Sequence, residues 1–203
     1  MQAIPYYGVL AIESLFNVVG VRLYEEPRYA VVDRIDDVEI RRYVPRVAAT
    51  VDFSTRFLDR GAAFKLLFDY IAGANAKADR IAMTAPVAVG PADLVGERIA
   101  MTAPVWRSER QMAFFLPASY ELSTAPTPRD ARVKLEAVPA QTLAVLRFTG
   151  MGGVAWLRQR QLQSKLVRSK WKVAGEPFMF YYDAPFTVPF LRRNEAAVPV
   201  EAR

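Results

Sequence analysis

A succession of strand, helix and strand occurs twice in this sequence and constrains its fold more than any other feature. Residues 47–54 alternate apolar and polar side chains, as a half-buried strand does, and a helical stretch and a methionine-containing strand follow. Residues 142–149 begin the same succession, which ends in a strand at residues 177–183. Two such halves can join their strands into one curved sheet with both helices on one side. The pattern predicts an α+β fold with a concave face or cleft where the halves meet.

The other strands follow from alternation and turn residues. Residues 29–34 and 38–43 flank Ile35-Asp36-Asp37 and predict a hairpin, in which the two aspartates suit the turn. A short strand is expected at the C-terminal end. The same patterns predict further strands at residues 80–87, 98–105, 111–117, 133–137 and 142–148.

Eight residues of the chain occur twice. Arg-Ile-Ala-Met-Thr-Ala-Pro-Val fills residues 80–87 and again residues 98–105, with glycine and proline between the copies. This repeat is too short for a solenoid unit, and we expect two similar strands joined by a turn. Met83 and Met101 could be soft metal ligands, but methionine on an alternating strand is more typical of a core.

The composition excludes several kinds of chemistry. The 203 residues contain no cysteine and no histidine. This rules out disulfides, Cys-ligated zinc, iron–sulfur clusters, a Cys nucleophile and an imidazole base. We also find no phosphate-binding loop, dinucleotide turn or serine elbow, and no pair of acids that suggests a catalytic residue. The net charge of +6 favours anionic partners, but no Lys/Arg run resembles a nucleic-acid tail, so we expect no nucleic-acid partner.

The first helix is predicted over residues 57–72, with Ser54 and Thr55 as candidate caps and Gly73 as its end. Its apolar side chains cover about 200° of the circumference, about twice the stripe that packing on a sheet requires. The members of this arc are Ala63, Phe64, Leu66, Leu67, Phe68, Tyr70 and Ile71. The surplus surface must contact a neighbouring loop, the N-terminal segment or a flat apolar ligand.

In the ligand-binding interpretation, Phe64 and Phe68 present two rings side by side, four residues apart. Arg60 and Lys65 could then meet carboxylates at the edge of the ligand.

The second helix is predicted over residues 154–172 and contains no acid. Leu162 and Leu166 would face inward. Its basic side chains indicate either a solvated face or a surface for an anionic ligand or a membrane. The four on one face are Arg158, Lys165, Arg168 and Lys172.

Residues 1–24 are almost uncharged and form a separate apolar segment. They can be a helical arm packed on the domain or a partner chain. They can also be a membrane-surface anchor or a degenerate signal. A spanning helix is not expected, because Glu13 and Asn17 interrupt the apolar run. We therefore expect one domain at residues 25–203, in a protein that is cytoplasmic or membrane-associated through this segment.

Several motifs point to a family. They are Glu25-Glu26-Pro27-Arg28-Tyr29, Glu39-Ile40-Arg41-Arg42-Tyr43, Ala63-Phe64, Phe68-Asp69-Tyr70-Ile71-Ala72-Gly73-Ala74-Asn75, the doubled Ile-Ala-Met-Thr-Ala-Pro-Val, Phe114-Phe115-Leu116-Pro117, Tyr182-Asp183-Ala184-Pro185 and Arg192-Arg193-Asn194-Glu195. In this order they resemble the bacterial branch of the SOUL heme-binding family over roughly residues 25–200.

The resemblance implies a twisted, mostly antiparallel, β-barrel-like sheet that is built from a duplicated β-α-β unit and flanked by two helices. It also implies non-covalent binding of b-type heme or another tetrapyrrole for transport, buffering or sensing. Some members bind the iron through histidine, which this chain lacks. Others hold the porphyrin by apolar contacts with the first helix and by basic residues near the propionates.

Carried onto this sequence, the second mode uses Phe64, Leu67 and Phe68 as the wall and Arg60 and Lys65 as the rim. Gly61 stands where one basic residue would fall, and Thr187 or Val188 where a lysine can occur. Tyr70, a methionine or a lysine would remain as iron ligands. Two other functions stay open: a binding module for another amphipathic ligand or a protein partner, and an enzyme that acts on a tetrapyrrole.

Overall fold

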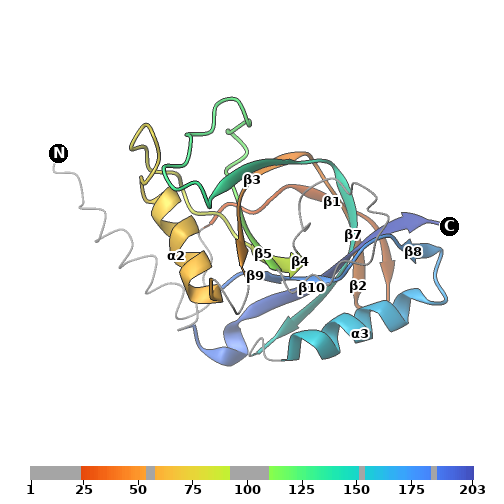
Figure 1. Ribbon diagram of the computed structural model, residues 1–203. Coiled ribbons are helices and arrows are strands. Elements are labelled where there is room, and N and C mark those ends of the chain that lie inside the picture. Colours follow the sequence, from red (N-terminus) through yellow and green to blue (C-terminus); the bar gives the residue numbers. More distant parts are fainter. Residues whose placement is uncertain (1–23, 54–57, 92–109, 151–153, 184–186) are drawn as a thin grey trace, which may run out of the picture.

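The computed structural model describes residues 24–53, 58–91, 110–150, 154–183 and 187–203 (Figure 1). The helices are α2 (Arg60–Ile71), α3 (Ala155–Leu166) and the 3-10 helix η2 (Pro189–Leu191). The strands are β1 (Tyr29–Ile35), β2 (Val38–Tyr43), β3 (Arg46–Phe53), β4 (Val87–Pro91), β5 (Arg110–Phe115), β6 (Lys134–Val138), β7 (Gln141–Thr149), β8 (Trp171–Val173), β9 (Phe178–Tyr181) and β10 (Arg193–Ala202).

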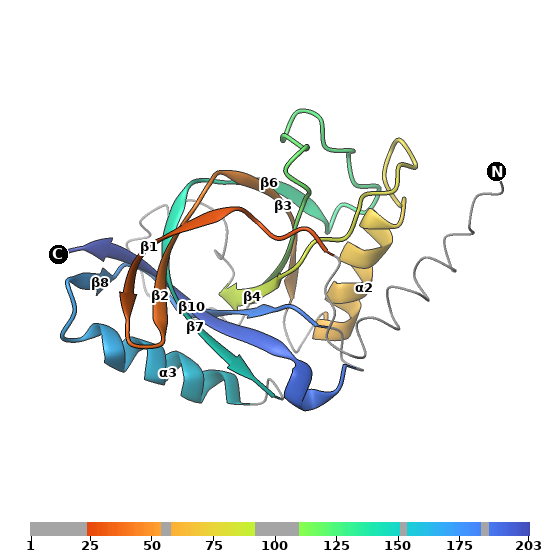
Figure 2. The same cartoon turned by 180° about the vertical axis from the view of Figure 1, so that it is seen from behind.

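The strands form one curled antiparallel sheet in the order β1-β2-β7-β10-β9-β4-β5-β3-β6, and β8 also pairs with β10. The sheet bends into a half-barrel, and α2 and α3 both lie on its convex side (Figure 2). The α+β prediction and the placement of both helices on one side are confirmed. Each helix covers its own half: α2 packs against β3 and β5, and α3 against β7 and β10.

Local sequence explains the first hairpin and the first helix. Asp36 adopts a positive φ of 52° in the turn between β1 and β2, a conformation that aspartate tolerates better than most residues. Gly73 ends α2 with a φ of 115°, as predicted. The helix begins later than expected, and its cap is Asp59, whose side chain accepts a hydrogen bond from the Ala62 backbone N–H at 2.8 Å. Ser54 and Thr55 lie outside the described residues.

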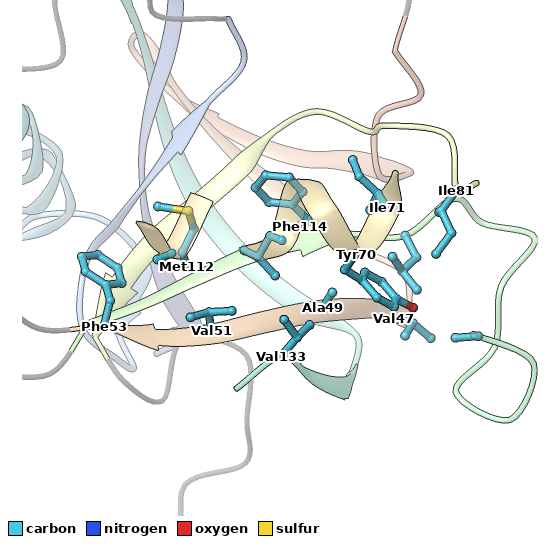
Figure 3. Close-up of a cluster of buried hydrophobic side chains, with 14 of the residues drawn as sticks. Val47, Ala49, Val51, Phe53, Tyr70, Ile71, Ile81, Met112, Phe114 and Val133 are labelled. Carbon is cyan, nitrogen blue, oxygen red and sulfur yellow. The ribbon is translucent and has the colours of Figure 1, made fainter. Parts of the chain in front are cut away.

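Three clusters of buried side chains form the core. One lies between α2 and the convex face of β3, β4 and β5, and is shown in Figure 3. A second lies between α3 and the convex face of β2, β7, β9 and β10. The third contains no residue of α2 or α3 and fills the concave side with aromatic rings, among them Tyr43, Phe115 and Phe180. Both faces of the sheet thus carry buried side chains.

The first copy of the repeated octapeptide is not a strand. Residues 80–86 have no ladder, and β4 begins only at Val87. Pro86 has no N–H for a ladder, and neighbouring segments supply the partners instead: the Ala85 N–H donates to Glu25 O at 3.0 Å, and the Thr84 hydroxyl donates to Phe115 O. Met83 packs against the α2 cluster, as core methionine does. The second copy and Met101 lie outside the described residues.

The C-terminal third differs from the sequence prediction in two ways. The second helix ends at Leu166 rather than at residue 172, because residues 171–173 pair with β10 as β8. The expected short end strand is β10, the longest of the described strands, and it lies between β7 and β9. β10 begins with three polar residues, Arg193, Asn194 and Glu195. They are buried in the structure, but in the sequence their polarity obscures the strand pattern.

None of the helices in the described part of the chain is long and apolar enough to cross a membrane. The apolar segment before Tyr24 lies outside that part.

Candidate functional site

Helix α2 presents two different stripes of side chains. Ala63, Leu67, Tyr70 and Ile71 are buried against the sheet. Arg60, Phe64 and Phe68 follow one another at intervals of four residues along the flank of the helix, where side chains lie above one another. The flank stripe is therefore the part of the apolar arc that can meet a ligand, and we call it the α2 flank.

The two phenylalanines of the α2 flank form one flat apolar surface. Their rings stack with centroids 6.3 Å apart and planes only 14° from parallel. The edge of the Phe114 ring from β5 supports Phe64 at 5.3 Å. Phe64 nevertheless remains 37% exposed, which is high for a large aromatic side chain. The neighbouring strand thus holds the rings in place without covering them.

The two predicted rim cations have different partners. The Arg60 guanidinium lies 4.6 Å above the ring of Tyr181 at the end of β9, a cation–π contact that orients it beside the aromatic pair. The Lys65 ammonium is 2.6 Å from the Asp69 carboxylate, one turn further along the helix. Because Asp69 neutralises Lys65, Arg60 supplies most of the positive charge of the α2 flank.

Other residues named from the sequence do not reach this surface. Leu67 is completely buried beneath the helix. The Tyr70 hydroxyl is buried and donates to Pro126 O at 2.8 Å, and burial raises the pKa of Tyr70 to about 12. A phenol that keeps its proton and faces the core is a poor iron ligand. Thr187 is also fully buried, and its carbonyl accepts a hydrogen bond from Arg192 Nε at 2.6 Å.

Sequence reasoning missed Tyr181 and Phe114, which position the α2 flank from two separate strands. Phe114 lies in a motif that carried the family resemblance, and Tyr181 lies in a strand that was predicted. The alternation of each strand could have shown that both side chains face the helix side. Which helical residue each contacts depends on the sheet order, and local pattern does not contain that information.

A second group of polar residues lies on the concave side. The Glu195 carboxylate is 0% exposed and accepts hydrogen bonds from three side chains. Arg41 donates from both terminal nitrogens at 2.7 and 3.2 Å, Arg193 Nε at 3.0 Å and the Tyr182 hydroxyl at 2.8 Å. Burial alone would raise the pKa of Glu195, but the two guanidinium groups offset burial and hold that pKa below its usual value.

This concave cluster joins four parts of the chain. Arg41 belongs to β2, Tyr182 directly follows β9, and Arg193 and Glu195 belong to β10. Arg193 also donates to the Glu26 carboxylate at 2.9 Å. Because every oxygen of Glu195 already has donors, the cluster has little capacity to bind a further cation. We assign it to the stability of the half-barrel.

Arg46 is the concave cation without an acidic partner among the described residues. Its guanidinium lies between the rings of Tyr43 and Phe115, at 4.8 and 4.6 Å. It donates to the Gln141 side-chain oxygen at 3.1 Å. Burial lowers the pKa of Arg46 to about 10. The group therefore stays charged at neutral pH and closes one end of the aromatic cluster.

The basic side chains of the second helix region mostly have partners. Lys165 lies 2.6 Å from Asp37, Lys170 lies 3.2 Å from Asp33, and Lys172 lies 2.9 Å from Glu201. Arg158 stacks over the Phe148 ring at 5.2 Å. Leu162 and Leu166 face inward, as predicted. Most of this surface is thus an ion-paired, solvated face.

Comparison with known families gives this arrangement a context. A family model described as SOUL heme-binding protein matches residues 24–95 and 90–199, which is most of the chain. The chain belongs to the SOUL family. The two matched stretches overlap between the copies of the octapeptide, so each stretch contains one copy. No curated protein matches the sequence.

Solved structures share the fold of this SOUL chain at low sequence identity. The C-terminal domain of EcmrR superposes with a TM-score of 0.58 at 13% identity, over 86% of this chain and 99% of that one. A hydrolase from Listeria innocua superposes with a TM-score of 0.53 at 10% identity, over 88% and 93% of the two chains. At such identities the likeness establishes the half-barrel and leaves the chemistry of the site to its own residues.

The α2 flank can be tested against the heme that the family name implies. A porphyrin is a flat apolar ring system with two carboxylates, and the flank offers a flat aromatic pair beside one cation. No described residue of the flank supplies an axial iron ligand, because Lys65 is paired with Asp69 and Tyr70 faces the core. Nor do the described residues contain any group of three His, Cys, Asp or Glu side chains that could hold a metal ion. Among the described residues, the α2 flank thus offers a tetrapyrrole ring contacts and one positive charge.

Proposed function

We propose that this SOUL protein is a non-enzymatic binder of heme or a similar tetrapyrrole, and that the α2 flank is its binding surface. The observation that carries the proposal is the stacked pair of Phe64 and Phe68, which stays partly exposed beside the Arg60 guanidinium. A planar ligand laid on these rings removes apolar surface from water, and a propionate can reach Arg60. Binding of this kind suits transport, buffering or sensing.

Hemin titration of the full chain, followed by the Soret absorbance, tests this function. We expect a shifted Soret band that saturates at micromolar hemin. Phe64→Asp should weaken the apparent affinity by about tenfold or more, because the charged side chain keeps water on the ring surface. Val167→Asp is the matched control, since it introduces the same charge at an exposed apolar position beyond the end of α3.

The cations of the flank allow a finer test. Arg60→Gln should weaken hemin binding several-fold, and Lys65→Gln should have a smaller effect because Asp69 already neutralises Lys65. Absence of any Soret shift at micromolar hemin, or equal weakening by Phe64→Asp and Val167→Asp, contradicts the proposal. Progressive loss of the Soret band after addition of a reductant would instead identify an enzyme that degrades the pigment.

A further inference from the structure

Large apolar side chains are exposed at one edge of the molecule, where β7 ends and β10 begins. On η2, Phe190 is 73% exposed, and on the first turn of α3, Trp156 is 61% exposed. Val154, Leu157 and Leu191 beside them are also exposed. Aromatic side chains this open to water are uncommon on a soluble surface and usually mark an interface.

Sheet pairing brings these residues together. Thr149 at the end of β7 pairs with Arg193 at the start of β10, and the Asn194 side chain donates to Gly150 O at 2.8 Å. The first turn of α3 follows Gly150 closely in the chain, and η2 directly precedes β10. Figure 1 and Figure 2 show the helical turn before β10, which is η2, and the start of α3 at the same edge. We call the five exposed apolar residues at this edge the aromatic tip: Val154, Trp156, Leu157, Phe190 and Leu191.

Two arginines, Arg160 of α3 and Arg192 after η2, lie next to the tip in the chain. Helix α3 contains Arg158, Arg160 and Lys165 and no acidic residue. Arg160 is exposed, lies one turn after Trp156 on the same stripe, and forms no ion pair with any described residue. Arg192 follows η2 directly. The tip thus combines apolar rings with cations, while the other end of α3 is occupied by the Lys165–Asp37 pair.

We propose that the aromatic tip inserts into the interface of an anionic membrane. Tryptophan and phenylalanine with arginine beside them suit the boundary between headgroups and acyl chains, where rings are buried and guanidinium groups meet phosphates. The net charge of +6 adds a general attraction to anionic lipid. This inference is independent of the proposed heme binding.

Co-sedimentation of the full chain with vesicles tests the proposal. We expect binding to vesicles with equal amounts of phosphatidylglycerol and phosphatidylcholine, and much weaker binding to pure phosphatidylcholine. The double variant Trp156→Ser/Phe190→Ser should lower the partition coefficient by about tenfold or more. Arg160→Gln should lower it about fivefold on the anionic vesicles alone. Val167→Ser, which removes a side chain 68% exposed at the other end of α3, is the matched control and should bind as the parent does.

The outcomes separate the tip from other routes to the membrane. If the double variant binds anionic vesicles as well as the parent does, another part of the chain carries binding and the proposal is wrong. Equal binding to pure phosphatidylcholine, or no binding to either vesicle, also overturns it. A change of oligomeric state in the double variant without vesicles would show that the tip contacts a second copy instead. Hemin titration without vesicles should be unchanged in the double variant, so failure here leaves the proposed function intact.

Discussion

On the convex face of the sheet the buried side chains are aliphatic and aromatic, and a helix covers each half, whereas the concave face encloses a carboxylate between two arginines. Leu67 and Leu162 are completely buried under α2 and α3. Glu195 is equally buried, but neither α2 nor α3 contributes to the cluster on its side of the sheet. The helices α2 and α3 bury side chains on the convex side, and the curvature of the sheet buries those on the concave side. The two faces should therefore respond differently to substitution.

The largest effect is expected on the concave side. Arg41→Leu removes the guanidinium that donates twice to Glu195 and leaves that carboxylate buried with less compensation. Loss of one partner of a buried ion pair typically costs about 3–5 kcal/mol. Urea unfolding should show a loss of this size. Arg34→Leu, which removes an exposed arginine that pairs with Glu39, is the control and should change stability by less than about 1 kcal/mol.

This contrast also explains which parts of the fold could be predicted from the sequence. The apolar residues of α2 that face the sheet and the alternate residues Val47, Ala49, Val51 and Phe53 of β3 are buried together, as their periodicities predict. Arg41, Arg193 and Glu195 occupy alternate strand positions as well, but charged residues there normally indicate a solvent-facing side. The curl of the sheet brings these residues together on the concave side, and no local window contains that curl. For this reason the sequence predicts only a short strand at the C-terminal end, where the structure has β10.

The candidate site was likewise predictable from the sequence only where it depends on local spacing. The spacing of Phe64 and Phe68 predicted their proximity, and the structure stacks them. The same arc included Leu67, because a wide apolar arc does not show which part faces the sheet and which part lies at the flank. The contact between Arg60 and Tyr181 joins residues far apart in sequence and depends on the place of β9 in the sheet.

The convex side should show a smaller loss of stability, and its size should depend on which side of α2 the residue occupies. Leu67→Ala creates a cavity beneath α2 and should cost about 3 kcal/mol in the free energy of unfolding. Phe64→Leu on the flank should cost less than about 1 kcal/mol, because water already reaches this ring. Equal losses in chemical denaturation would mean that the α2 flank belongs to the core and is not a binding surface.

Acid should weaken the concave side selectively. Burial raises the pKa of Glu195, but Arg41 and Arg193 outweigh burial, so the folded-state pKa lies below the ordinary 4.5. The unfolded chain therefore binds the proton more readily, and the carboxylate contributes its full stability above pH 4.5 and loses it as the pH falls through the folded-state pKa. Denaturant midpoints measured across this range should fall less steeply in Glu195→Gln than in the parent. Parallel pH profiles would contradict a charged Glu195.

The smallest effect should be confined to one end of α2. Asp59→Ala removes the side-chain oxygen that accepts from the Ala62 N–H, and loss of such a cap costs about 1 kcal/mol. Because the cap satisfies only the first turn, hydrogen exchange should accelerate there and leave β2 and β10 protected. Asp59→Asn keeps an acceptor at the same place and should restore most of the protection. Arg41→Leu, in contrast, should accelerate exchange in β2, β9 and β10 together. The Arg41 guanidinium on β2 binds Glu195 of β10, and Glu195 also accepts a hydrogen bond from Tyr182 next to β9.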